Sequence, residues 1–232
     1  MREISEEEWE WDNGTTTRMN KEVFLKKYKS IILEWASKNE SLIIKNRQKY
    51  SYGTKSTLEC INERNKVSQA IQLSRIRNQG GIDLKTADRL MDWGGFNKFP
   101  LRDPNEIIKI TSEAFDFVEQ GDVYQGIYKL MLINGVGIAR ASKIIGLFNQ
   151  DKYCIYDSRV GTALRTLKKG DLRLILCPPG RLRKGDACSN KKWAENYEKL
   201  IWTLEVIRDY LNEKSHKFRI ADIEMALFMM GE

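Results

Sequence analysis

The chain has 232 residues, of which 41% are hydrophobic and four are proline. This composition is typical of a globular protein with one large domain or two small lobes. No apolar run approaches the roughly 20 residues that a membrane-spanning helix needs, and the acidic first residues do not resemble a secretory signal. We therefore expect a soluble, intracellular protein without membrane contacts.

The net charge of +7 is unevenly distributed along the chain. Residues 1–12 contain one base and six acids, a balance of −5, so the remainder has +12. A basic body of this size suits a polyanionic partner, because neutralised phosphates release their counterions, although charge of this kind also serves solubility. We treat residues 1–20 as an acidic extension and 21–232 as the main domain.

The cysteine and histidine content argues against common metal and hydrolase sites. Cys60, Cys154, Cys177 and Cys188 lie far apart without a C-x-x-C pair, and His216 is the only histidine. This spacing does not fit a zinc site or an iron–sulfur loop. One histidine also disfavours a Ser-His-Asp or Cys-His hydrolase. We expect neither a metal nor a cofactor.

The hydrophobic periodicity along the chain is helical almost throughout. In chain order, helices are predicted over 21–37, up to Arg77, from Asp83, over 106–119 after Pro104, and over 123–133, 158–167, 193–211 and 221–230. No convincing pair of strands is found, so the predicted fold class is all-α. The segment 167–192 breaks the pattern. Nine bases and two acids lie between Arg165 and Lys192, which indicates a basic insertion. It is either a solvated surface loop or, near the site of a polyanionic partner, a segment that contacts the partner's backbone or gates the substrate.

The most informative stretch is 132–148, where a helix is followed by Gly135-Val136-Gly137 and then by a second apolar-faced helix. Glycines permit a tight turn and a close approach of the backbone to an anion. The unpaired N–H groups at the start of the second helix then point at that anion. Arg140 and Lys143 lie within reach of the same phosphate. Such glycines also serve helix packing alone, so the triplet by itself is a weak signal.

The second helix is followed by Tyr153-Cys-Ile-Tyr-Asp-Ser-Arg-Val160, in which Asp157 immediately precedes another helix. The hairpin and this aspartate together resemble the helix-hairpin-helix, Gly-Pro-Asp superfamily of DNA glycosylases, which includes endonuclease III and the adenine and 8-oxoguanine glycosylases. The clear resemblance covers 130–165, and a weaker one reaches upstream to 72–74.

This resemblance implies a two-lobed helical protein, a nucleoid-associated monomer that binds double-stranded DNA. The iron–sulfur loop of endonuclease III is missing from this sequence, so we expect no iron–sulfur cluster. The hairpin, within 123–148, implies that Gly135, Val136, Gly137 and Arg140 hold the DNA backbone. Asp157, within 153–167, is implied as the catalytic carboxylate, which stabilises positive charge on the sugar or activates water against it. The alternative is that Asp157 only caps the following helix.

Two departures from the superfamily pattern affect the expected reaction. Asn134 replaces the usual hairpin proline, and Ala139 occupies the position of the lysine that forms a Schiff base in bifunctional members. Lys143, one turn further on, remains as a phosphate contact or as a displaced lyase amine. We therefore predict hydrolysis without strand cleavage.

Base extrusion requires an aromatic pocket and a wedge. The pocket candidates are Trp93, Phe96 and Tyr156, the wedge candidates are Arg75, Asn78 and Gln79, and Asp222 and Glu224 are further candidate acids. For each aromatic residue a core position is the alternative. Three alternatives to repair by a monofunctional enzyme stay open: a non-catalytic DNA-binding adaptor, a bifunctional enzyme using Lys143, and excision of hypermodified bases from phage DNA.

Overall fold

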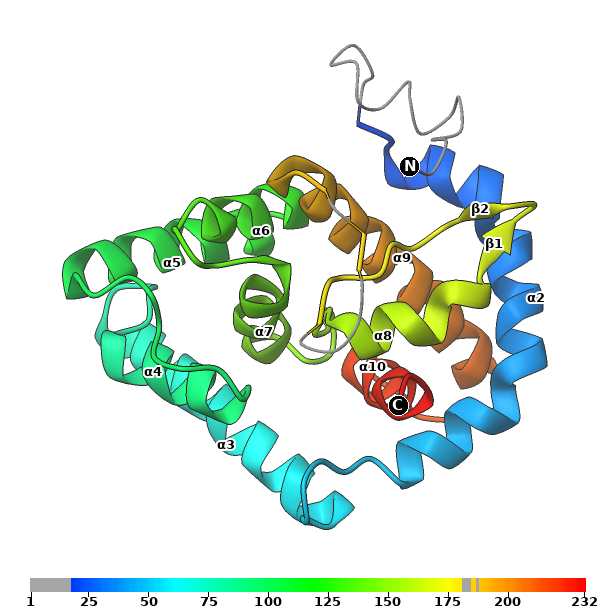
Figure 1. The fold of residues 1–232 in the computed structure, drawn as a ribbon, viewed down its shortest axis with the longest axis horizontal. Helices are drawn as coiled ribbons and strands as arrows, with labels where there is room; N and C mark the ends of the chain where they lie inside the picture. Colours follow the sequence, from blue (N-terminus) through cyan, green and yellow to red (C-terminus); the bar gives the residue numbers. More distant parts are fainter. Residues whose placement is uncertain (1–17, 181–184, 187) are drawn as a thin grey trace.

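The computed structural model describes residues 18–180, 185, 186 and 188–232, and that part of the chain is mostly helical, as predicted (Figure 1). The helices are α2 (Lys21–Gln48), α3 (Thr57–Arg77), α4 (Leu84–Trp93), α5 (Pro104–Glu119), α6 (Val123–Met131), α7 (Ile138–Phe148), α8 (Ser158–Ala163), α9 (Asn190–Glu213) and α10 (Ile220–Met230). Most of the acidic extension, residues 1–17, lies outside the described residues.

Side-chain caps explain where several helices begin. Ser56 and Glu59 form a capping box at α3, Asp83 caps α4 by accepting from the Thr86 N–H, and Asp103 caps α5. Each cap satisfies N–H groups that have no partner inside the helix. The predicted helix start at Pro104 is confirmed. The first helix runs further than predicted, to Gln48, because its buried face continues through Ile43.

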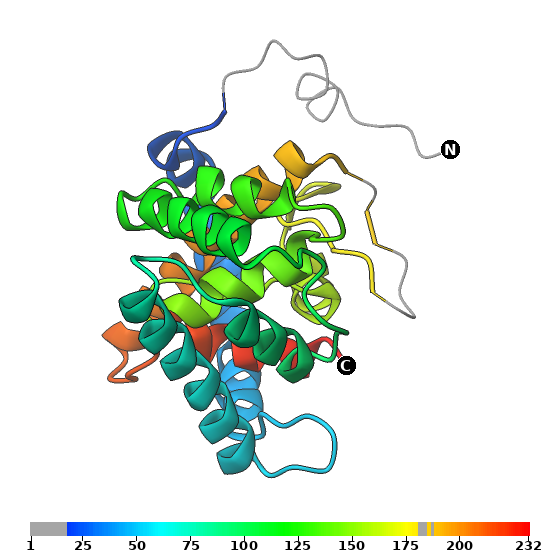
Figure 2. The same ribbon diagram turned by 90° about the vertical axis from the view of Figure 1, so that its left-hand side faces the viewer.

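The two ends of the described chain pack together. The helix α2 lies against α9 and α10, whereas α3 to α7 form a neighbouring group that joins the first through contacts of α6 and α7 with α9. Figure 1 shows α4 and α5 on one side and α2 on the other, with α7, α9 and α10 between them, and Figure 2 shows the same arrangement from the α5 side. One continuous apolar core runs through both groups.

The segment after α8 differs from the prediction in two respects. The expected helix over 158–167 ends at Ala163 and continues as a 3-10 turn over Leu164–Thr166, followed by two short paired strands, β1 (Lys168–Lys169) and β2 (Leu172–Arg173). The prediction without strands is therefore wrong at this point, where Gly170 adopts a left-handed φ of 59° at the turn.

The basic insertion is also not simply a surface loop. Its apolar run 174–178 is buried, and the Leu176 N–H donates to Asn196 of α9 at 2.9 Å. Apolar side chains fix this part of the insertion against the core. Residues 181–184, three of which are basic, lie outside the described residues. Among the described helices, none is both long and apolar enough to cross a bilayer.

Candidate active site

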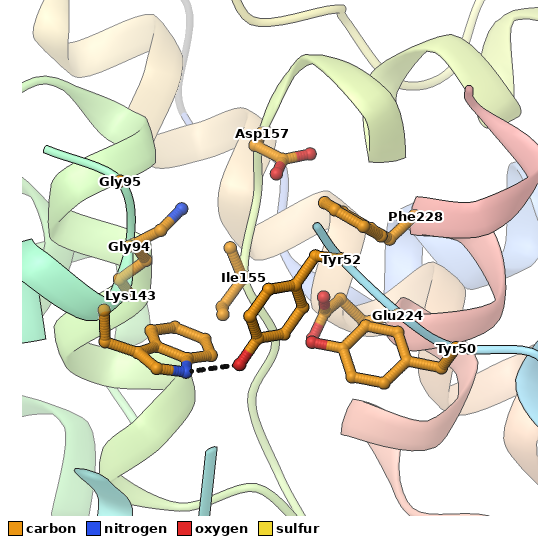
Figure 3. Close-up of a pocket in the computed structure, with 10 residues that line it drawn as sticks. Tyr50, Tyr52, Gly94, Gly95, Lys143, Ile155, Asp157, Glu224 and Phe228 are labelled. Atoms are coloured by element: carbon orange, nitrogen blue, oxygen red, sulfur yellow. Dashed lines mark hydrogen bonds between the residues drawn. The ribbon is translucent and has the colours of Figure 1, made fainter. Parts of the chain in front are cut away.

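A small cavity of about 240 Å³ opens where segments from both helix groups meet (Figure 3). It is lined by Tyr50 and Tyr52 from the α2–α3 connection, Trp93, Gly94 and Gly95 at the end of α4, Lys143 of α7, Ile155 and Asp157 before α8, and Glu224 and Phe228 of α10. Pockets for drug-sized ligands span about 300–1,000 Å³. The cavity is therefore suited to a single planar ring system.

Aromatic side chains form one wall of the cavity. The Trp93 Nε1–H donates to the Tyr52 hydroxyl at 2.8 Å, and that hydroxyl donates to Glu63 at 3.2 Å. The ring centroids of Tyr50 and Tyr52 lie 6.0 Å apart, and those of Tyr50 and Phe228 lie 5.9 Å apart. Burial raises the pKa of Tyr52, so its phenol stays neutral. Rings held in this way offer stacking surfaces to a flat heterocycle.

Asp157 caps α8, as the sequence suggested, and its carboxylate lines the cavity. Its Oδ1 accepts the backbone N–H groups of Arg159 at 3.0 Å and Val160 at 3.1 Å, which makes it the N-cap of α8. The side chain is half-buried and lines the cavity. The two backbone bonds to Oδ1 fix the orientation of the carboxylate and leave Oδ2 for other partners.

Lys143 lies inside the same cavity, only 7% exposed. Burial lowers its pKa, and the charges of Asp157 and Glu224 oppose that effect. Gly94 makes room for the side chain, because a Cβ added there would lie 2.7 Å from both Cδ and Cε of Lys143. A buried amine of this kind is badly placed for the expected contact with a surface phosphate.

The two additional acidic candidates have different surroundings. Glu224 lines the cavity, is 2% exposed, and accepts a hydrogen bond from the fully buried Arg64 at 2.5 Å. Burial raises the pKa of Glu224, and the Arg64 charge opposes this. Asp222 instead pairs with Arg47 and Arg219 at the start of α10. Asp222 is therefore a structural residue and not a site acid.

The glycine hairpin leads into a helix start that has no side-chain cap. The Val136 N–H donates to the Ile133 carbonyl at 2.9 Å, and Gly135 adopts a φ of +82°. The exposed Gly137 starts α7 without any side-chain cap, and a Cβ added to it would meet nothing within 4 Å. The first N–H groups of α7 therefore remain available to an anion. The Val136 side chain is buried, so only its backbone can contribute.

Arg140 and Phe96 lie together beside the hairpin. The Arg140 guanidinium donates to the Gly135 carbonyl and lies 4.6 Å from the Phe96 ring centroid. Phe96 also lies 5.2 Å from the Lys143 ammonium and does not line the cavity. Of the predicted aromatic pocket residues, Trp93 is in the cavity wall, whereas Phe96 supports its neighbours.

Tyr156 was expected in the pocket and lies in the core instead. It is fully buried, its hydroxyl donates to the Leu176 carbonyl at 2.5 Å, and its ring packs against Trp193 and Tyr197. In an extended segment successive side chains point to opposite sides. Ile155 and Asp157 face the cavity, so the residue between them must face away.

The wedge candidates are not close to the cavity. Arg75 donates to the Gly80 carbonyl at 3.0 Å and to Glu119 at 2.9 Å, and Asn78 donates to the Ser74 carbonyl at 2.7 Å. Only Gln79 is exposed, with a left-handed φ of 51°. These residues precede α4, whereas Trp93 ends it, a separation of about 15 Å along a ten-residue helix. Local hydrogen bonds fix Arg75 and Asn78, so a wedge role is not supported for them.

Tyr50, Tyr52 and Phe228 were missed by sequence reasoning. Two of them lie in a short inter-helix connection and one in the last turn of α10, so no local motif marks them. Comparison with protein-family models, curated proteins and solved structures finds no match to this chain.

Proposed function

We propose that this protein is a DNA glycosylase that extrudes a damaged or modified base from double-stranded DNA and hydrolyses its N-glycosidic bond with Asp157. The principal observation in support is one aromatic cavity that contains a backbone-fixed carboxylate and lies beside an uncapped, glycine-led helix start. The first feature suits a flat base and a cationic sugar, and the second suits a phosphate.

The spacing of the two features is compatible with one DNA strand. The phosphate-binding end of α7 is at Ile138, and Lys143 of the same helix lines the cavity. Five residues of α-helix correspond to about 7.5 Å, a distance that one extruded nucleotide can span. A phosphate held at the hairpin would therefore place the attached base at the cavity.

The chain's own residues can perform the reaction. Loss of the base leaves positive charge on the sugar, and an ionised Asp157 beside C1′ would stabilise it or activate the attacking water. The aromatic rings of Tyr50, Tyr52 and Trp93 would hold the base out of the duplex and exclude bulk water. The products would be a free base and an intact strand with an abasic site.

The decisive experiment replaces Asp157 and compares it with a matched cap. Asp157→Asn keeps a capping oxygen and removes the charge, so excision should fall by roughly two or more orders of magnitude while the fold persists. Asp103 caps α5 through the same pair of backbone contacts, to Asn105 and Glu106. Asp103→Asn should leave excision unchanged. Near-normal excision by folded Asp157→Asn would refute the assignment.

The assay begins with base release from duplexes with several damaged or modified bases, including the hypermodified bases of phage DNA. Alkali-labile strand breaks would reveal abasic sites. A protein that bound these duplexes and left every base attached would be a non-catalytic adaptor. The preferred substrate would distinguish repair from defence against invading DNA.

The cavity position of Lys143 favours a second candidate, a bifunctional glycosylase and lyase. An amine with a lowered pKa, buried beside Asp157, is chemically able to attack C1′ and displace the base. The resulting imine would permit β-elimination and strand cleavage without alkali. Borohydride would reduce that imine to a stable protein–DNA adduct. An adduct that disappears in Lys143→Ala would establish the lyase, whereas release of the base without an adduct supports simple hydrolysis.

A further inference from the structure

We propose that Glu224 selects the substrate by accepting a hydrogen bond from an N–H donor on the far edge of the extruded base. The inference rests on the proposed function, because it names the class of base that the same cavity takes. That class comprises bases with an amino or imide N–H at this edge, and excludes bases whose corresponding edge has no hydrogen.

Arg64 orients Glu224. Its Nη2–H donates to Glu224 Oε2 at 2.5 Å, and its Nε–H donates to Gln150 at 3.0 Å. Arg64 is fully buried and belongs to α3, so its hydrogen bond fixes the side chain of Glu224, which belongs to α10. This arrangement engages Oε2 and leaves Oε1 for a partner in the cavity.

The position of Glu224 in the cavity fits contact with a base rather than with a sugar. Asp157 is half-buried, whereas Glu224 is 2% exposed, so Glu224 lies deeper. Figure 3 shows Glu224 between Asp157 and Tyr50, beside the ring of Tyr52. A base whose glycosidic bond reaches Asp157 would direct its opposite edge toward Glu224, with the aromatic rings beside its faces.

The chemistry of the group determines what it accepts. A carboxylate paired with arginine has only acceptor oxygens, so it recognises N–H and rejects a bare ring nitrogen, whose lone pair it would repel. If the bound base has no N–H at this edge, the buried carboxylate oxygen has lost its water without gaining a hydrogen bond, and the free energy of binding is less favourable. Sites built around such a bond discriminate strongly against ligands that lack the donor.

The test measures binding of free bases to the full chain by ligand-observed NMR. Two pairs differ in one amino group: adenine against purine, and cytosine against pyrimidin-2-one. The expected result is at least one pair in which the donor-bearing base binds about tenfold or more tightly. Equal affinities within every pair, or no binding by any base, would overturn the inference.

The variant Glu224→Gln tests whether the preference between the two bases of a pair can be inverted. The Arg64 guanidinium can bind only the amide oxygen, so the Gln amide N–H₂ would face the cavity and the preference should invert toward the base with a bare acceptor. A purely structural pair predicts no inversion. Phe228→Leu is the control, because it removes ring contact and should weaken both members of a pair alike.

Two precautions keep the test decisive. If thermal unfolding shows that Glu224→Gln is not folded, the double variant Arg64→Met/Glu224→Met removes both buried charges and should abolish the preference. Retention of the parent preference in either folded variant would refute the role of Glu224. Excision by the parent is measured separately, so excision without donor preference overturns only this inference. Donor preference without excision overturns only the proposed catalysis.

Discussion

At the scale of single residues, the cavity combines groups that are costly to bury. Lys143 has a lowered pKa because burial disfavours its charged form, and the nearby Asp157 and Glu224 only partly offset this. Functional sites commonly contain such destabilising groups, and their removal often stabilises the fold at the expense of activity. Both consequences can be measured at Lys143.

We expect Lys143→Met to raise the free energy of unfolding at pH 7 by on the order of 1 kcal/mol. The pKa of Lys143 is lower in the folded chain than in the unfolded chain. Burial of the charged lysine therefore lowers the free energy of unfolding fully at pH values below the folded pKa. This cost disappears as the pH rises from the folded pKa to the ordinary lysine pKa. The gain from Lys143→Met should therefore shrink between pH 7 and pH 10. Urea unfolding at both pH values measures it, with the exposed Lys152→Met as control. A destabilised Lys143→Met at pH 7 would mean that attraction to the two carboxylates outweighs burial.

Gly94 permits the observed position of Lys143. In Gly94→Ala the new Cβ would lie 2.7 Å from the lysine Cδ and Cε, so the flexible stem must move. We expect excision to fall about tenfold with little loss of stability, because the lysine moves and the backbone does not. In a Lys143→Ala background, which has no side-chain atoms at the Cδ and Cε positions, the same change should have no further effect, since neighbouring residues acting through one contact are non-additive. Additive losses in excision assays would show that Gly94 acts independently of Lys143.

At the scale of elements, the two glycines of the hairpin between α6 and α7 have different backbone conformations and surroundings. Gly135 needs its left-handed φ of +82°, and an added Cβ would lie 3.3 Å from Pro100, whereas Gly137 has an ordinary φ of −90° and open space around it. A side chain at position 135 would therefore be strained, whereas one at position 137 would not, although the two glycines look equivalent in the sequence.

We expect Gly135→Ala to cost about 1–2 kcal/mol of stability, because a non-glycine residue is strained in the left-handed region. Gly137→Ala should change stability by less than about 0.5 kcal/mol and should weaken duplex binding several-fold, since its methyl group would occupy the space where a phosphate approaches. Thermal unfolding and fluorescence anisotropy measure the two effects. Unchanged DNA affinity in Gly137→Ala would remove the hairpin from the DNA interface.

At the scale of the whole molecule, the excess of positive charge should govern DNA affinity. The net charge is +7 with residues 1–12 and +12 without them. We expect the logarithm of the binding constant to fall with the logarithm of salt with a slope steeper than about −4, as for five neutralised phosphates at roughly 0.9 each.

Removal of residues 1–12 should strengthen binding at low salt, and the difference should vanish near 1 M salt, where the screening length is about 3 Å. Titrations of one duplex with both forms at several salt concentrations test this. A flat salt dependence of the full chain would exclude the DNA backbone as its main partner.

The local part of the site was predictable from sequence. Helical periodicity, the Asp103 cap before Pro104 and the Gly135–Gly137 turn depend on neighbours in the chain, so the helices and the hairpin could be placed without tertiary information. The capping role of Asp157 was also predictable, because the residue directly precedes a predicted helix, which is a local feature. The short strands after α8 were not, since two-residue strands leave no periodic pattern.

The cavity was decided only by the tertiary structure. Tyr50, Trp93 and Phe228 come from three distant segments and meet because α3, α4 and α10 pack around α7 and α8. No local pattern could show that Tyr156 points to the core while Asp157 points to the cavity, or that Arg64 and Glu224 pair across two helices. Local sequence determines which groups a segment offers, whereas long-range packing determines which of them share one buried space.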